Sequence, residues 1–266
     1  MVRVVVLEKA YGRYRPEDFT PAFLTLCSGL AVHVRVVGTV GKGWLLVELS
    51  GEDEEVAARL IEAEMGLAPV RADRLRRSSV IRGRISAVVD QGLYVDIGVF
   101  EPVNLEAFVP LAALRAQLAD GRELSTRELA DLFCLAENMP LEVRLLEAPG
   151  RGENEEGVPE PIKAELSEGQ VRAFEAWVLS GLDKIIVIGA SHHALKRAVG
   201  ATRLHEHVVS LGRLGLLENY AILKLGASPR KFMAALRRRL REARILAFRP
   251  RKVMESFPGR YGPPRL

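Results

Sequence analysis

The stretch that decides the fold is Arg82 to Gly98, RGRISAVVDQGLYVDIG. Its second half, from Gly92 to Gly98, alternates apolar and polar residues at a period of two, which is typical of a half-buried antiparallel strand. The pattern predicts a strand that begins near Gly83, bends, and resumes at Gly92. The apolar segment AFVPL, Ala107 to Leu111, follows at a short interval, so we expect the start of a small barrel.

The surrounding segment completes this barrel. It predicts five strands, at Val80 to Ala87, Gly92 to Ile97, Ala107 to Leu111, Leu141 to Leu146 and Ile162 to Ser167. A helix from Thr126 to Leu135, capped by Ser125, separates the third strand from the fourth. Five strands with a helix after the third form the OB barrel, which often holds single-stranded nucleic acid on an open sheet face. We expect an exposed, mobile loop at Pro149 to Pro161, which is rich in Gly, Pro and Glu.

The segments on either side of the barrel share one order of elements, βαββαβ. The first predicts strands at Val2 to Leu7, Val32 to Val40, Trp44 to Leu49 and near Val70, and helices at Pro16 to Leu30 and Glu54 to Met65. The second predicts strands at Lys184 to Ile188, near Val208, Tyr220 to Leu225 and Arg244 to Phe248, and helices at Ser191 to Val199 and Pro229 to Arg241. This order matches the split βαβ, ferredoxin-like pattern.

The sequence therefore predicts an α+β chain of four parts. These are a ferredoxin-like domain at 1–73, an OB-fold domain at 78–168, a ferredoxin-like α/β domain at 182–250 and a basic flexible tail at 251–266.

Composition favours a globular protein of the cytoplasm. The chain has 266 residues, 48% of them hydrophobic and 27% charged, and its apolar runs are too short for a membrane-spanning helix. The first residues lack the layout of a signal peptide, so we expect no membrane partner. Cys27 and Cys134 stand far apart, outside any metal-ligand spacing, and we expect buried structural thiols and no cofactor.

Charge is concentrated at the C-terminal end. The whole chain carries a formal net charge of +4, yet Ser228 to Leu266 contain twelve lysines and arginines against Glu242 and Glu255. The preceding residues are therefore net acidic. Such asymmetry indicates a polyanionic partner.

The arginines of this end fall on a helix and a tail. Phe232, Leu236 and Leu240 form an apolar stripe, which leaves the basic residues on the solvent face. We expect contacts to RNA from Arg230, Arg237, Arg238, Arg241, Arg251, Lys252 and Arg260. The tail from Arg249 to Leu266 also carries Phe257 and Tyr261 between prolines and glycines, and we expect it to order on RNA. The alternative is a basic end that is merely solvated.

The barrel segment resembles a known RNA-binding module. Gly83-x-Ile85, GLYVDIG, AFVPL and KAELS, Lys163 to Ser167, are similar to the S-one type of OB domain, which is repeated in a bacterial ribosomal protein. The resemblance implies that Tyr94 stacks on a base and that Lys163 contacts a phosphate. Gln91 and Pro110 stand where the family often has an aromatic residue and a histidine. In the alternative, Tyr94 packs against a neighbouring domain.

Four histidines invite an enzymatic alternative. His192, His193, His205 and His207 lie within a short span, and an extended His205-Glu206-His207 would place two imidazoles on one side for a metal. Gly189-Ala190-Ser191 offers backbone amides to an anion, but it lacks the length and the lysine of a P-loop, which favours a plain strand-to-helix turn.

The whole chain, including ENxxxxKLG from Glu218 to Gly226, is similar to a widespread archaeal family of conserved, uncharacterised proteins. The resemblance implies an archaeal, cytoplasmic protein near RNA metabolism or translation. We therefore expect a non-catalytic protein that binds single-stranded or structured RNA, ribosomal RNA included. The alternatives are a metal-dependent nucleic-acid enzyme centred on the histidines and a scaffold for a protein partner.

Overall fold

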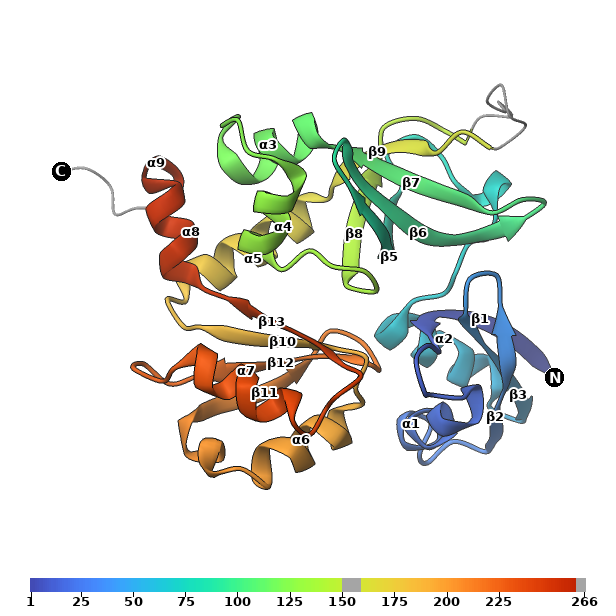
Figure 1. Ribbon diagram of the computed structural model, residues 1–266. Coiled ribbons are helices and arrows are strands. Elements are labelled where there is room, and N and C mark those ends of the chain that lie inside the picture. Colours follow the sequence, from blue (N-terminus) through green and yellow to red (C-terminus); the bar gives the residue numbers. More distant parts are fainter. Residues whose placement is uncertain (150–158, 262–266) are drawn as a thin grey trace. The chain divides into compact units, whose positions relative to one another are not determined.

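The computed structural model describes residues 1–149 and 159–261, apart from the side chain of Arg203 (Figure 1). The chain is mixed α+β and divides into two compact units. Unit 1 comprises Met1–Arg77, Asp96–Glu106 and Ala148–Ile162, and unit 2 comprises Ser78–Val95, Ala107–Glu147 and Lys163–Leu266. Most of the expected loop from Pro149 to Pro161 lies outside the described residues.

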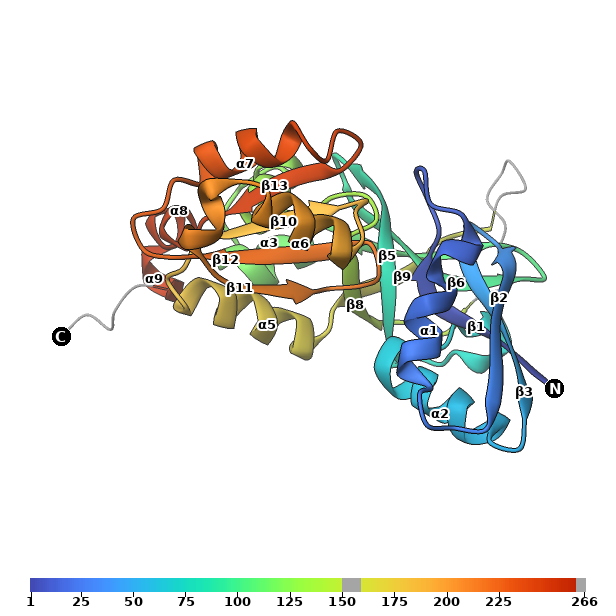
Figure 2. The same ribbon diagram turned by 90° about the horizontal axis from the view of Figure 1, so that it is seen from below.

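Unit 1 is built on a three-stranded antiparallel sheet. Its strands β1 (Val2–Lys9), β2 (Val32–Val40) and β3 (Trp44–Gly51) have the order β1-β3-β2. The helices α1 (Thr20–Leu26) and α2 (Glu54–Met65) contact each other and the sheet (Figure 2). The predicted helix from Pro16 is divided into a 3-10 turn and α1, since Pro21 lacks an amide hydrogen and stands in the first turn of α1.

The strand predicted near Val70 forms, but its partner is a strand of the barrel. β4 (Val70–Arg71) pairs in parallel with β6 (Gly92–Glu101). Just before β4, Leu67 forms an isolated antiparallel bridge with Val6 of β1.

A buried ion pair in unit 1 explains the aspartate of the deciding stretch. Lys9 Nζ lies 2.5 Å from Asp96 Oδ2, and the two side chains are 7% and 5% exposed. Asp96 Oδ1 accepts hydrogen bonds from Trp44 Nε1 at 3.1 Å and from the Gly98 amide at 3.0 Å. Asp96 therefore has a hydrogen-bonded structural role, as a buried carboxylate requires.

The central strands form a closed five-stranded barrel, which confirms the predicted one. Its members are β5 (Val80–Val89), β6, β7 (Leu105–Pro110), β8 (Pro140–Leu145) and β9 (Ile162–Leu166). The order is β6-β5-β8-β9-β7, and an additional pairing of β6 with β7 closes the ring. Each strand turns alternate apolar side chains inward, and the buried ones in unit 2 include Ile85, Leu93, Val95, Ala107, Val109, Leu141, Val143, Ala164 and Leu166.

Gly92 permits a close approach at the start of β6. Its φ is +153°, and a Cβ there would meet the Val109 carbonyl, with Pro110 Cα at 3.0 Å and the Phe108 ring at 3.1 Å. Any larger residue would force β6 away from the strand beside it, which is why the motif begins with glycine.

Three helices of unit 2 come directly before or after barrel strands in the sequence. The predicted helix is α4 (Thr126–Phe133), where the Ser125 hydroxyl accepts from the Glu128 amide in a reciprocal capping box. It ends before Leu135 because Cys134 adopts a left-handed conformation with φ 57°. The other two helices, α3 (Leu111–Ala119) and α5 (Glu168–Leu179), were not expected from the sequence.

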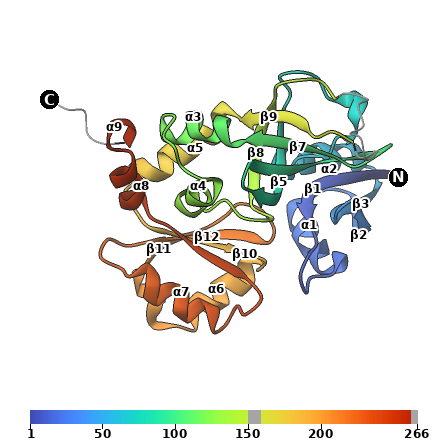
Figure 3. The same cartoon turned by 45° about the horizontal axis from the view of Figure 1, so that its top comes forward.

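The C-terminal part of unit 2 is a four-stranded antiparallel sheet. Its strands β10 (Lys184–Ile188), β11 (Val208–Arg213), β12 (Glu218–Leu223) and β13 (Arg244–Phe248) have the order β11-β12-β10-β13. The helices α6 (His192–Gly200) and α7 (Pro229–Arg237) cover one face through a shared apolar core (Figure 1). The opposite face packs against α5, where Trp177 contacts Tyr220 and Phe248 (Figure 3).

The Glu-Asn pair that begins the ENxxxxKLG stretch is buried and has polar partners within unit 2. Glu218 forms an ion pair with Arg84 of β5, and the two side chains are 2% and 1% exposed. Asn219 Nδ2 donates to the Ala190 carbonyl at 2.7 Å. These contacts join the C-terminal sheet to a barrel strand and to the turn before α6, so they specify the fold of unit 2.

A flexible tail was predicted at 251–266, but its described residues, 251–261, are helical and packed together with Pro250. They form α8 (Pro250–Ser256) and α9 (Pro258–Tyr261), which contact α5. Val253, Phe257 and Tyr261 are buried, at 0%, 1% and 5% exposure. The aromatic residues that the sequence analysis offers to RNA bases are thus covered by the protein itself. Residues 262–266 lie outside the described residues.

Candidate nucleic-acid interface

The strongest basic surface lies on α7 and the turn that follows it. Ser228 caps the helix by accepting from the Lys231 amide, and Pro229 occupies the first turn. Phe232, Leu236 and Leu240 are buried, as the stripe predicts. The helix ends at Arg237 rather than at Arg241, so the last arginines stand on a turn.

The basic side chains of this segment point to solvent. All of the predicted ones, Arg230, Arg237, Arg238 and Arg241, are exposed, and so are Lys231, Arg239 and Arg244. Arg237 donates to the Ile245 carbonyl at 3.4 Å and Arg239 to the Ala201 carbonyl at 2.9 Å. Neither contact neutralises the charge. Within the described part of the chain, these seven side chains form no ion pair.

The neighbouring helix α6 adds two cations that the sequence analysis passed over. Lys196 and Arg197 are exposed on α6, which shares its sheet face with α7. Arg239 reaches the carbonyl of Ala201, directly after α6, so the two helix ends lie together. We call the nine residues Lys196, Arg197, Arg230, Lys231, Arg237, Arg238, Arg239, Arg241 and Arg244 the α6/α7 basic surface.

The remaining predicted cations do not join this surface. Arg251 and Lys252 are exposed on α8, which packs with α5 on the other side of the sheet, and Arg251 pairs with Glu255 at 2.8 Å. Arg260 is an internal tie, since its guanidinium contacts Asp120 at 3.1 Å and Glu175 at 2.9 Å and is 17% exposed. Burial opposes the charged form of Arg260, but the hydrogen bond that its guanidinium donates to Glu175 helps to leave the pKa of Arg260 raised. The expectation that Arg260 is available to phosphate is therefore wrong.

A second candidate face lies on the outside of the barrel. Tyr94 on β6 is half-buried, and its ring centroid lies 4.9 Å from that of Phe108 on β7, at an interplanar angle of 47°. Lys163 is exposed on β9, which neighbours β7. Tyr94, Phe108 and Lys163 alternate with inward-facing residues, so all three side chains face outward. We call them the barrel face.

Phe108 is the member of this face that the sequence analysis missed. Its signal was the aromatic residue within AFVPL, one strand away from Tyr94. At the departures from the family pattern, Gln91 is exposed and Pro110 is the N-cap of α3. Phe108 therefore supplies an aromatic partner that neither of those two positions provides.

Within the part of the chain that the structure describes, the four histidines do not assemble into a metal centre. His205 and His207 lie on a 3-10 helix, Arg203–His207, instead of the extended segment expected, so they do not share one side as strand residues would. His192 Nδ1 lies 3.0 Å from Asn219 Oδ1, and His205 Nδ1 lies 3.1 Å from the Thr202 carbonyl. Among residues 1–149 and 159–261, no three His, Cys, Asp or Glu side chains are placed to hold a metal.

The Gly189-Ala190-Ser191 turn is likewise occupied by the protein. The amides of Gly189 and Ala190 both donate to the Leu217 carbonyl, at 3.0 and 3.1 Å, and Ser191 caps α6. These amides are committed, so the turn is a strand-to-helix connection rather than an anion cradle.

No helix that the structure describes in this chain is long and apolar enough to cross a membrane.

Comparisons with known proteins give a family match for the barrel segment and a distant structural similarity. No curated protein matches the chain. A crystal structure of a multidomain protein with nucleic acid binding domains, from Streptococcus pneumoniae TIGR4, is similar at 12% identity over 71% of this chain and 58% of that one. This chain thus spans less than two thirds of that protein, and the TM-score between the two structures is 0.20. Residues 75–178, which contain the barrel and α5, match the model of an uncharacterised family, described as the DUF2110 central domain.

Proposed function

We propose that this protein binds RNA without catalysis, with the α6/α7 basic surface supplying most of the affinity. The observation that carries the proposal is a set of exposed cations with no ion pair among the described residues. Surface arginines ordinarily alternate with acids, whereas an unneutralised cluster attracts a polyanion and releases its counterions.

The barrel face contributes stacking in this proposal. Tyr94 and Phe108 present two rings, and Lys163 presents a cation on a neighbouring strand. Bases of unpaired RNA stack on such rings, while the phosphate backbone meets the charge. The proposal also includes the finer features that the resemblance implies. These are an S-one type OB barrel, ferredoxin-like units before and after it, an archaeal source, and a cytoplasmic role in RNA metabolism or translation.

The domain division at 1–73, 78–168, 182–250 and 251–266 remains part of this proposal, with the last part amended to a packed helical end. The strand order β11-β12-β10-β13 with antiparallel neighbours supports a split βαβ unit at residues 182–250.

Filter binding with three probes tests the function. The probes are a single-stranded RNA, an RNA duplex and a DNA of matched length. We expect the protein to bind RNA. Tyr94→Ala should weaken its affinity for single-stranded RNA by about tenfold and leave its affinity for the duplex unchanged. Tyr14→Ala, which removes a half-buried aromatic of unit 1, is the matched control. Undetectable RNA binding at low salt would overturn the proposal.

A further inference from the structure

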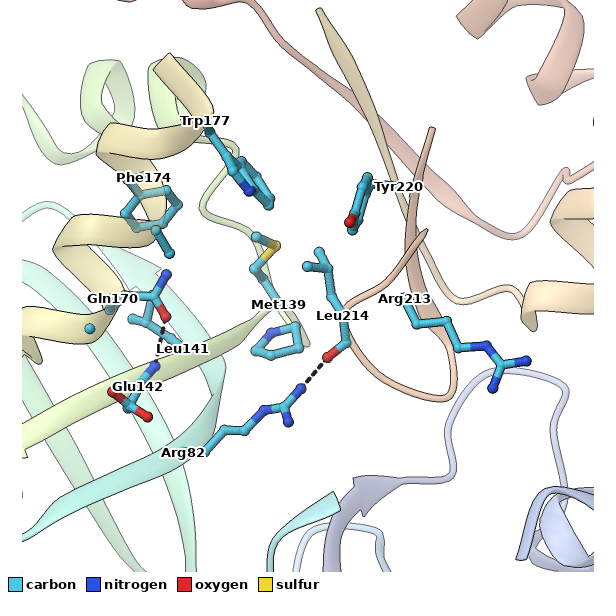
Figure 4. A pocket seen from close by; sticks show the side chains of 13 residues that line it. Arg82, Met139, Leu141, Glu142, Gln170, Phe174, Trp177, Arg213, Leu214 and Tyr220 are labelled. Atoms are coloured by element: carbon cyan, nitrogen blue, oxygen red, sulfur yellow. Dashed lines mark hydrogen bonds between the residues drawn. The ribbon is translucent and has the colours of Figure 1, made fainter. Parts of the chain in front are cut away.

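Unit 2 contains a cavity that belongs neither to the α6/α7 basic surface nor to the barrel face. Its volume is about 510 Å³, within the range of small-molecule sites. The walls come from β8, α5 and the β11–β12 hairpin, and Figure 4 shows the side chains around the hollow. Met139, Leu141 and Phe174 make a buried apolar floor. We call this hollow the α5 pocket.

Two aromatic rings border the α5 pocket. Trp177 and Tyr220 are half-buried, and their centroids lie 6.0 Å apart at 51°. Figure 4 shows the two rings at the same end of the hollow. Neither the indole N–H nor the phenol hydroxyl has a hydrogen-bond partner among the described residues. Each ring therefore combines an apolar face with a polar group left for a ligand.

The backbone is shaped to hold the tyrosine ring in this position. Gly212 on β11 pairs with Tyr220 on β12, and a Cβ at Gly212 would collide with the Tyr220 ring. The ring thus lies across the glycine, and its orientation depends on the absence of a side chain there.

The polar groups of the pocket favour a ligand with a polar edge. Arg213 belongs to the lining, but Figure 4 shows its guanidinium pointing away from the two rings. Arg82 donates to the Leu214 carbonyl, which orients its guanidinium (Figure 4). Gln170 Oε1 accepts from the Glu142 amide at 3.0 Å, which leaves its Nε2 as a donor. The Glu142 carboxylate is engaged by the Ser167 hydroxyl.

We propose that the α5 pocket binds a nucleobase. The base packs against Trp177 and Tyr220, and its polar edge meets the Gln170 amide. A flat ring with a polar edge matches this combination, because stacking needs the rings and the edge needs a hydrogen-bond donor. Either an unpaired base of RNA or a free mononucleotide has this chemistry. The RNA source rests on the proposed function, and the mononucleotide source does not.

Tryptophan fluorescence of the full chain tests the pocket directly. The other tryptophan, Trp44, is 1% exposed and hydrogen-bonded to Asp96, so a quench by added ligand reports on Trp177. The probes are AMP, UMP and single-stranded hexamers of A and of U, with ribose 5-phosphate as a probe that lacks a base. We expect saturable quenching by base-containing probes and none by ribose 5-phosphate.

Variants separate pocket binding from binding elsewhere. By anisotropy of a labelled hexamer or by calorimetry with AMP, Trp177→Leu should weaken binding about tenfold, while Trp177→Phe, which keeps a ring, should retain most of it. Arg213→Gln should leave the affinity for AMP unchanged, because the guanidinium points away from the two rings (Figure 4). Arg172→Gln is the control, since Arg172 is an exposed arginine of α5 outside the pocket. Gly212→Ala should weaken binding by displacing the Tyr220 ring. Circular dichroism verifies that each variant is folded.

The outcomes distinguish the two proposals. Quenching by hexamers alone assigns the pocket to RNA, and quenching by AMP or UMP with competition against hexamers assigns it to a mononucleotide as well. Mononucleotide binding without any RNA binding would retain the pocket and overturn the proposed function. RNA binding with no quench, and with Trp177→Leu at wild-type affinity, would overturn the pocket and retain the function.

Discussion

At the scale of single residues, two positions of the stretch from Arg82 to Gly98 have structural roles that explain their residue types. Asp96 is buried against Lys9 and accepts from Trp44 and Gly98. Gly92 leaves room for the backbone of the strand beside it. Asp96 thus keeps the polar phase of GLYVDIG, two residues after Tyr94, and is buried because Lys9 and Trp44 bind its carboxylate.

The first prediction concerns this pair. Asp96→Ala should lower the free energy of unfolding by about 3 kcal/mol, because it leaves the Lys9 ammonium buried without its carboxylate. Glu48→Ala, which removes the exposed ion pair with Arg3, is the control and should cost under about 1 kcal/mol. Urea denaturation measures both. Equal effects of the two variants would contradict a buried role for Asp96.

The second prediction concerns Cys134. Burial raises the pKa of its thiol from 9.0 to about 12. The thiol therefore stays protonated in the native protein at pH 8, and we expect no reaction with a disulfide reagent until the chain is unfolded. Cys27, whose pKa burial also raises, should be protected in the same way. Rapid labelling of Cys134 in native protein would contradict this.

The same shift has a consequence for stability. Between pH 9 and pH 12 the folded state keeps the Cys134 proton that the unfolded state loses, so its contribution to stability is full below pH 9 and falls above it. Relative to Cys134→Ala, the wild type should lose about 2 kcal/mol between pH 8 and pH 10.5. An unchanged difference between the two proteins would mean that the thiol is not buried.

At the scale of elements, local pattern predicted most of the structure. The strands Val32–Val40, Lys184–Ile188 and Arg244–Phe248 and the helix Glu54–Met65 have the predicted bounds, since period and capping residues mark them locally. The helix α5 was missed although Ser167 caps it and its apolar residues recur at helical spacing. The pocket residues Gln170, Phe174 and Trp177 lie on this helix, so the site there was invisible to the sequence analysis.

Other elements depend on contacts far apart in the sequence. Composition indicates disorder at residues 250–261, but burial of Phe257 and Tyr261 and the ion pairs of Arg260 order the segment. The outward pairing of Tyr94 with Phe108 depends on which strands are neighbours, which no local pattern fixes.

The third prediction tests this ordered end. Phe257→Ala should lower the free energy of unfolding by about 3 kcal/mol, since the ring is 1% exposed and contacts Phe133. Lys252→Ala, which changes an exposed residue of the preceding helix α8, should alter stability little. A flexible tail would instead leave both variants as stable as the wild type.

At the scale of the whole molecule, charge and chemistry are distributed over distinct surfaces. The α6/α7 basic surface, the barrel face and the α5 pocket lie on different elements, and only the first carries many unneutralised cations. Long-range attraction therefore comes from α6 and α7, while rings on the barrel and in the pocket engage bases at short range.

The salt dependence of RNA binding tests this account most directly. A filter-binding series compares the wild type with Arg230→Gln/Arg238→Gln/Arg241→Gln, each residue exposed and without an ion pair among the described residues. Each lost phosphate contact should reduce the log-log slope by about 0.7 for single-stranded RNA, so we predict a slope shallower by about 2 and weaker binding to every RNA sequence. An unchanged slope and affinity in the triple variant would contradict the central role of this surface.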